Sequence, residues 1–228
     1  MSLTIDLSIS LIRGSIKYSV LIAVITGTIY YYKYKHTYLK YFLLLLWYIA
    51  FTEFFGDYIL NNDILIYTDE NGKKYNLWIV NLLYTIFFPV IFYIYLKEIK
   101  NNKYRLWIKI FLIGYLIISV MNWYILQNFL TEWSELPFII GSFSTMVTII
   151  FYFIELLKSD KVAIFHRTLL FWISVGLLLF HAGSIPFTIK INGYALIPGT
   201  HQLFLIMYVL AIIMYSTFTF GFIWSKKE

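Results

Sequence analysis

Two carboxylates and a histidine stand out within long apolar stretches of the chain. Glu53 and Asp57 are four residues apart, and this spacing places both carboxylates on one face of a helix. Because an ionisable group is costly in hydrocarbon, such residues mark ligand sites and ion pathways. A buried Glu53 needs a partner, and His181 is the nearest candidate in predicted depth. The sequence therefore predicts a binding site for a small polar or cationic ligand, or one end of a proton or ion path.

Other polar residues fall at a similar predicted depth, in the half of the helices that we expect to face outward. The predicted site comprises Glu53, Asp57, Asn81, Asn122, His181, Ser184, His201 and Gln202. If these side chains point inward, they line a polar pocket that opens to the outside. The alternative is hydrogen bonding between helices, worth about 0.6 kcal/mol per contact, and we favour it for Asn81 and Asn122. For Asp57 and His201 the alternative is solvation at the membrane surface.

A second stripe of polar residues follows a single predicted helix. Thr145, Thr148, Tyr152 and Glu155 recur at helical spacing, from mid-membrane to the inner edge. This stripe is a candidate for an inner continuation of the path. The alternative is close helix packing, in which hydroxyl groups bond across an interface.

Several chemistries do not fit the residue types present. The chain has no cysteine, which excludes disulfides, thiolate metal sites and thiol nucleophiles. His181 and His201 with a carboxylate would be donors for zinc, but no His-x-x-x-His or His-Glu-x-x-His motif is present. No glycine-rich phosphate loop and no Gly-x-Ser-x-Gly motif is found. We therefore expect no metal and no cofactor; the sequence leaves an enzymatic activity open and favours a role without one.

The composition of the whole chain predicts where these residues are placed. The 228 residues are 61% hydrophobic and 13% charged, with a mean hydropathy of +0.75. A soluble domain has roughly 45–50% apolar and about 25% charged residues. The net charge of +6 is spread over short segments between apolar runs, where it meets lipid headgroups rather than nucleic acid. The sequence predicts an all-α integral membrane protein with a single domain over residues 1–228.

Seven stretches are long and apolar enough to cross a bilayer as helices, which takes roughly 20 residues. They run approximately over 15–32, 39–60, 77–95, 106–125, 136–157, 168–187 and 202–224. The first is the weakest, because Lys17 falls near its start. An earlier start would let Arg13 and Lys17 snorkel to the surface.

Most basic residues fall on one side of the predicted bundle. That side carries Lys33, Lys35, Lys40, Lys97, Lys100, Lys103, Arg105, Lys109, Lys158, Lys161, Arg167, Lys226 and Lys227. The opposite side carries Arg13, Lys17, Lys73, Lys74 and Lys190. Because basic loops are retained in the cytoplasm, the N-terminus is predicted outside and the C-terminus inside.

Two of the predicted external connections contain Asn-Gly within a β-favouring run, at Asn71-Gly72 and Asn192-Gly193. Asn-Gly is the strongest short signal for a hairpin turn, so two short extracytoplasmic β-hairpins are predicted. Their matched placement leaves open a parallel repeat of spans 1–3 and 5–7, although the helices share no convincing residue identity.

Three segments carry a resemblance to a known group of proteins. They are Trp47-Tyr48 through Glu53, Asn76-Leu-Trp78 through Asn81, and Phe171-Trp172-Ile-Ser-Val-Gly176 through Gly183. In these segments, roughly a quarter of the chain, it resembles small bacterial heptahelical membrane proteins of unassigned function. In layout it is also similar to the seven-helix sensor modules of bacterial signalling proteins. The resemblance implies a seven-helix membrane protein with a sensory or regulatory partner.

These observations lead to three functional hypotheses for a multi-pass protein of a bacterial cytoplasmic membrane. The first is a receptor-like sensory protein that binds a small polar ligand and signals to a separate protein partner. The second is a small-solute or ion transporter, with Glu53 and His181 as a protonatable pair. The third is a structural subunit of a membrane assembly.

Overall fold

The computed structural model describes residues 2–68, 74–159, 164–189 and 201–227, and for residues 2–13, 74 and 201–204 it describes the backbone alone. These residues form long helices and one short strand pair. The long helices are α1 (Ser2–Ile29), α2 (Lys40–Asn61), α3 (Leu77–Glu98), α4 (Asn102–Met121), α5 (Glu135–Leu157), α6 (Leu169–Thr188) and α8 (His201–Trp224). The short elements are η1 (Tyr31–Lys33), β1 (Tyr67–Thr68), β2 (Lys74–Tyr75), η2 (Asn122–Leu126) and η4 (Phe165–Arg167).

The long helices have the length and composition of membrane spans. Six of them are apolar enough over their described residues to cross a bilayer, and α1 contains a shorter apolar stretch over Gly14–Ile29. The prediction of an all-α membrane bundle is confirmed at this level. The helix itself begins at Ser2, ahead of the predicted first span, whose start near residue 15 stays a prediction. Lys17 therefore lies in the middle of α1 instead of at its start.

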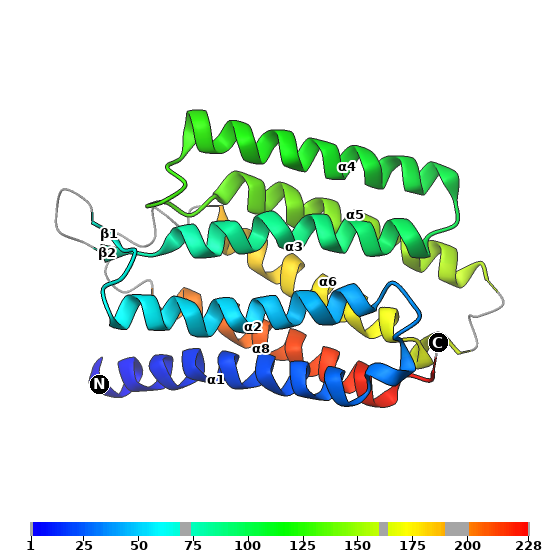
Figure 1. Ribbon diagram of the computed structural model, residues 1–228, viewed down its shortest axis with the longest axis horizontal. Helices are drawn as coiled ribbons and strands as arrows, with labels where there is room; N and C mark the ends of the chain where they lie inside the picture. Colours follow the sequence, from blue (N-terminus) through cyan, green and yellow to red (C-terminus); the bar gives the residue numbers. More distant parts are fainter. Residues whose placement is uncertain (1, 69–73, 160–163, 190–200, 228) are drawn as a thin grey trace.

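The helices form a closed ring of neighbours (Figure 1). Each long helix packs against the next one in the chain, and α8 packs against both α6 and α1. A contact between α3 and α5 crosses the ring. In this arrangement α1 and α8 are adjacent, and α3 contacts α5 through the interior of the ring.

Aromatic rings fill the centre of the bundle. The side chain of Phe88 on α3 is fully buried, and its ring centroid lies 5.1 Å from Tyr115, 5.6 Å from His181 and 6.1 Å from Phe138. Gly141 permits this packing, because a Cβ atom at that position would lie 2.6 Å from the ring of Phe88. One phenyl ring thus joins α3 to α4, α5 and α6.

The strand pair lies in the connection between α2 and α3. Tyr67 pairs with Tyr75 and Thr68 pairs with Lys74, in antiparallel register. The Asn71-Gly72 turn lies outside the described residues, so the first hairpin stays a prediction. Asn192-Gly193 also lies outside them, and Phe187, where the second β-favouring run begins, is still helical.

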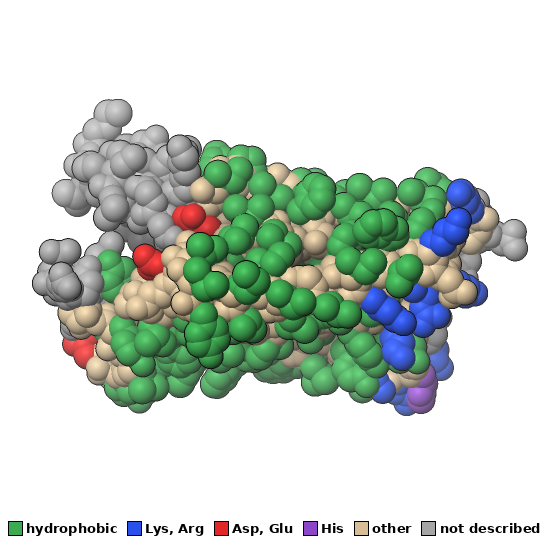
Figure 2. Space-filling view, turned by 90° about the horizontal axis from the view of Figure 1, so that it is seen from above, with side chains coloured by type: hydrophobic (Ala, Val, Ile, Leu, Met, Phe, Trp, Pro, Cys, Tyr) green, Lys and Arg blue, Asp and Glu red, His purple; other side chains and the backbone are tan. Residues whose placement is uncertain are grey.

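Charge separates the two ends of the bundle. Figure 2 shows, on the face that it draws, Lys and Arg side chains at one end, Asp and Glu at the other, and a hydrophobic surface between them. We call the end with β1 and β2 the β end. The other end, with the α1–α2 and α3–α4 connections and the end of α8, we call the basic end (Figure 1). An apolar belt between polar ends is the surface expected of a protein in a lipid bilayer.

At the basic end, the α1–α2 connection holds the end of α8. The ammonium of Lys33 donates hydrogen bonds to the carbonyls of Phe222 (3.1 Å), Ile223 (2.7 Å) and Ser225 (2.8 Å). The last carbonyls of a helix lack partners within it, so this side chain caps α8. The neighbouring Tyr34 hydroxyl donates to the Gly27 carbonyl. Burial lowers the pKa of Lys33 and raises the pKa of Tyr34.

Candidate functional site

The two carboxylates of α2 have different surroundings. Asp57 forms an ion pair with Lys17 of α1. Glu53, one turn deeper, is half-buried and interacts electrostatically with Tyr84 of α3 and Tyr215 of α8. Glu53 therefore lies toward the interior, between three helices.

His181 lies in the core of the bundle on α6 and has no exposed surface. Its Nδ1 atom is 2.9 Å from the hydroxyl oxygen of Ser142 on α5, within hydrogen-bond distance. Its Nε2 atom has no hydrogen-bond partner among the described residues. The ring is surrounded by phenyl groups at centroid distances of 5.3–6.0 Å, from Phe87, Phe88, Phe138 and Phe180.

These surroundings favour a neutral imidazole, because a buried charge without a partner is costly. One nitrogen of a neutral imidazole donates and the other accepts, and the serine hydroxyl can satisfy either role. Glu53 is not a hydrogen-bond or ring partner of His181 in the described part of the chain. The ring of Phe87 contacts both His181 and Tyr84, which is a neighbour of Glu53.

Asn81 and Asn122 fasten the connection between α4 and α5. The Asn81 amide donates to the carbonyls of Phe129 (2.7 Å) and Glu132 (2.8 Å), and its oxygen accepts from the Ser134 amide (3.0 Å). The amide of Asn122 donates to the Gln127 side-chain oxygen (3.1 Å), while the Asn122 side-chain oxygen has no partner among the described residues.

The role of Gln127 was missed in the sequence analysis. Its side-chain oxygen also accepts from the backbone amide of Glu135, where α5 begins. The only signal in the sequence was a carboxamide within a short connection that carries no basic residue.

The remaining predicted residues of the outer cluster are near helix ends. The Ser184 hydroxyl is buried and donates to the carbonyl of His181 at 3.4 Å. His201 and Gln202 begin α8, and their side chains lie outside the described residues.

The polar stripe on α5 has two parts: threonine hydroxyls that are buried, and the carboxylate of Glu155, which binds the connection before α4. Thr145 and Thr148 have no exposed surface, and their hydroxyl oxygens lack hydrogen-bond partners in the described part of the molecule. Glu155, at the basic end, accepts from the backbone amides of Lys100 (2.8 Å) and Asn101 (3.1 Å). Its carboxylate thus holds the connection that leads into α4.

Two buried residues of other helices lie beside this stripe, next to Tyr152. The hydroxyl groups of Tyr95 on α3 and Ser174 on α6 are 2.6 Å apart, and the ring of Tyr152 on α5 packs 5.9 Å from that of Tyr95. The contribution of Tyr95 was missed, because tyrosines near the ends of spans are common and usually face the interface.

Cavity space near the predicted pocket is small. A cavity of about 10 Å³ lies between α3, α4 and α5, close to the smallest space that holds one water molecule. Its lining residues are Asn81, Tyr84, Thr85, Tyr115, Trp123, Ser134, Pro137 and Phe138. Among the described residues, no group of three His, Asp or Glu side chains is arranged to hold a metal ion.

No protein family model, no curated protein and no solved structure matches the chain.

Within the predicted site, some polar groups use all of their hydrogen-bonding capacity and others do not. Asn81 has three partners, and Asp57 is paired. Among the described residues, His181, Asn122, Thr145 and Thr148 keep buried polar atoms without partners, and these groups have capacity left for a ligand.

Proposed function

We propose that the protein is a receptor-like sensory protein of a bacterial cytoplasmic membrane, with its N-terminus outside and its C-terminus inside. It binds a small polar ligand in the half of the bundle near the β end and passes the change to a separate protein partner at the basic end. The observation that carries this proposal is the imidazole of His181, which is fully buried and uses only one of its two nitrogens.

A buried polar atom without a partner costs roughly 1–3 kcal/mol. Such a cost within a membrane bundle is typical of a functional position. A ligand with a hydroxyl or amine group would supply the missing partner of His181, and Glu53, which interacts with Tyr84, would supply a charge.

The packing of α6 on α8 supports transmission along the bundle. A Cβ atom on Gly176 would lie 2.3 Å from the Thr217 hydroxyl oxygen, and one on Gly183 would lie 2.5 Å from a methyl of Leu210. Since side chains of α8 pack directly on the backbone of α6 at two levels, we expect the two helices to shift together. A shift of His181 would therefore displace α8.

A displacement of α8 would move its last turn, which lies at the basic end of the bundle. Lys33 caps its last carbonyls, and the guanidinium of Arg167 lies 5.1 Å from the ring centroid of Trp224. Two connections thus contact the end of the helix, and a partner bound to them would sense its position.

A transporter is the second candidate, and the buried hydroxyls of α5 favour it. Thr145 and Thr148 lie between the His181–Ser142 pair and the Tyr95–Ser174 pair along the helices. This order of polar groups is what a path through the bundle needs. Against it, neither imidazole nitrogen of His181 is hydrogen-bonded to Glu53 in the described part of the chain, as a protonatable pair would require.

The variant His181→Asn tests the proposal, because asparagine retains a group that can bond to Ser142 and removes the Nε2 atom. The protein in nanodiscs is screened by thermal unfolding against a panel of amino acids, sugars and small organic cations. We expect a panel compound to raise the unfolding midpoint of the wild type and not that of the variant. At 100 times its dissociation constant, a ligand stabilises by about 2.7 kcal/mol.

Ser142→Ala is the matched control, since it keeps Nε2 and releases Nδ1. We expect it to weaken the ligand effect without abolishing it. Uptake of the same compound by proteoliposomes, lost in His181→Asn, would establish transport instead. If both variants lose only stability and no compound acts, the structural-subunit hypothesis holds.

A further inference from the structure

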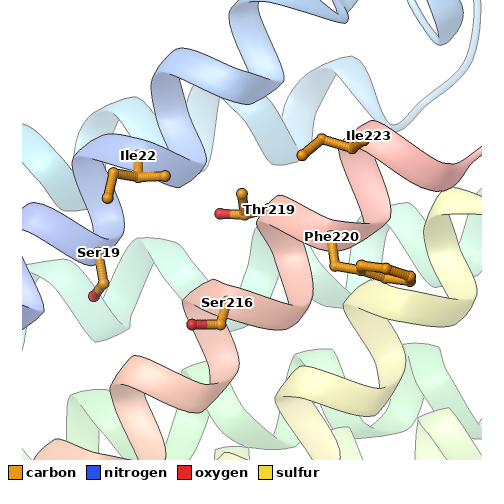
Figure 3. Close-up of a pocket in the computed structure, with 6 residues that line it drawn as sticks. All are labelled: Ser19, Ile22, Ser216, Thr219, Phe220 and Ile223. Atoms are coloured by element: carbon orange, nitrogen blue, oxygen red, sulfur yellow. The ribbon is translucent and has the colours of Figure 1, made fainter.

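A groove of about 270 Å³ runs between α1 and α8 on the surface of the bundle (Figure 3). It is lined by Ser19 and Ile22 of α1 and by Ser216, Thr219, Phe220 and Ile223 of α8. Ile22 and Ile223 are about half exposed, and both belong to the apolar belt. The groove therefore faces the hydrocarbon of the membrane.

The hydroxyl groups in the groove are satisfied by their own helices. Ser19 donates to the Ile16 carbonyl (2.7 Å), Ser216 to the Ile212 carbonyl, and Thr219 to the Tyr215 carbonyl. A polar ligand would have to compete with these hydrogen bonds, whereas an alkyl chain would not. The groove accordingly fits an apolar occupant.

The charges next to the groove are positive. Lys226 and Lys227 follow the last turn of α8 and are exposed, and Arg167 lies against Trp224. Among the described residues, neither α8 nor the segment 14–39 contains an Asp or Glu. An apolar groove that ends at a positive surface is complementary to an amphiphile with an anionic head.

We infer that the groove binds an anionic phospholipid. One acyl chain lies between α1 and α8, and the phosphate lies at Lys226, Lys227 and Arg167. The basic residues distinguish this occupant from a partner helix or a second copy of the chain, because an apolar helix gains nothing from lysines beside the groove, whereas a phosphate does.

The test uses the full chain in nanodiscs of equal parts phosphatidylcholine and phosphatidylglycerol. After extraction into mild detergent, native mass spectrometry counts the lipids that remain bound. We expect the wild type to retain phosphatidylglycerol in preference to phosphatidylcholine. Thr219→Leu fills the groove and should reduce retention of both lipids, while Val209→Leu, on an exposed position of α8 outside the groove, should not.

The headgroup contact is tested separately, on residues that are exposed. The double variant Lys226→Gln with Lys227→Gln should keep bound lipid and lose the preference for phosphatidylglycerol, by about fivefold for each lysine. Lys103→Gln, at the basic end on α4, is the control and should keep the preference.

Three results would overturn the inference. The first is equal retention of the two lipids by the wild type, and the second is unchanged retention in Thr219→Leu. The third is a dimer of the wild type that Thr219→Leu dissociates, which would identify the groove as an interface between copies.

Discussion

Single polar residues in the bundle differ in the number and kind of hydrogen-bond partners that their side chains have. Asn81 and His181 are both almost inaccessible and come from helices that face the interior. Asn81 uses two donors and its acceptor on the backbone of the α4–α5 connection, whereas His181 has one partner on α5. The first residue fixes a loop, and the second keeps capacity for another molecule.

We predict that Asn81→Leu lowers the free energy of unfolding by about 2–4 kcal/mol, because two carbonyls and one amide of a connection lose their partners. Thermal unfolding in detergent measures the loss. Faster proteolysis between residues 127 and 134 should accompany it, since the connection is released.

Asn62→Leu is the matched control, because the Asn62 side chain is exposed and, among the described residues, bonds locally to the carbonyl of Tyr58 at the end of α2. Its unfolding should match that of the wild type. If Asn81→Leu were equally stable, the structural role of Asn81 would be wrong.

For single residues, the sequence predicted the helix face on which a side chain lies better than it predicted the residue that the side chain contacts. The spacing of Glu53 and Asp57 placed both on one face, and both do interact with neighbouring helices. The partner of Asp57 was not predicted, because Lys17 is 40 residues away in the chain. Whether these residues bind a ligand stays a prediction.

Among the helices, the closeness of α6 and α8 depends on glycines. Gly176 faces Thr217 and Phe218 with no room for a methyl group. A new Cβ there has to separate the two helices or displace both side chains. The pair is therefore sensitive to a single added carbon.

We predict that Gly176→Ala destabilises the protein by about 1–3 kcal/mol through overpacking. Gly114→Ala on α4 is the control, since a Cβ atom there would meet nothing within 4 Å. That change should be neutral or stabilise by up to about 1 kcal/mol, because alanine favours the helix. Equal unfolding midpoints for the two variants would contradict the close packing.

The positions of helices were more predictable than their ends. Apolar stretches located the spans, because burial in lipid demands about 20 such residues. Local polar contacts set the ends: the side chain of Asn101 caps α4 by accepting from the amide of Lys103, and a π-turn over Asn122–Leu126 extends that helix. Such contacts are not readable from hydropathy.

At the scale of the whole molecule, the ring places the α1–α2 connection, the α3–α4 connection and the end of α8 together at the basic end. The order of neighbours around the ring follows the chain, but its closure by α8 against α1 was not predictable from hydropathy. Closure depends on tight contacts such as Gly27, where a Cβ atom would lie 2.9 Å from side-chain atoms of Leu43 and Phe222.

The predicted orientation can be measured directly, because the chain has no cysteine. Asn62→Cys at the β end and Lys35→Cys at the basic end are both at exposed positions. We expect a membrane-impermeant maleimide to label Asn62→Cys in intact bacterial spheroplasts. Lys35→Cys should react only after the membrane is permeabilised. The reverse pattern would place the basic end outside and remove the proposed orientation.

The cap on α8 also bears on how the protein is made. Lys33 emerges from the ribosome with the first connection, whereas the carbonyls that it binds lie 189–192 residues further along the chain. During biosynthesis this lysine has to stay hydrated at the membrane surface while five more helices are inserted. Its hydrogen bonds form only when α8 arrives, so insertion of α8, rather than of the early helices, brings the bundle to its closed state.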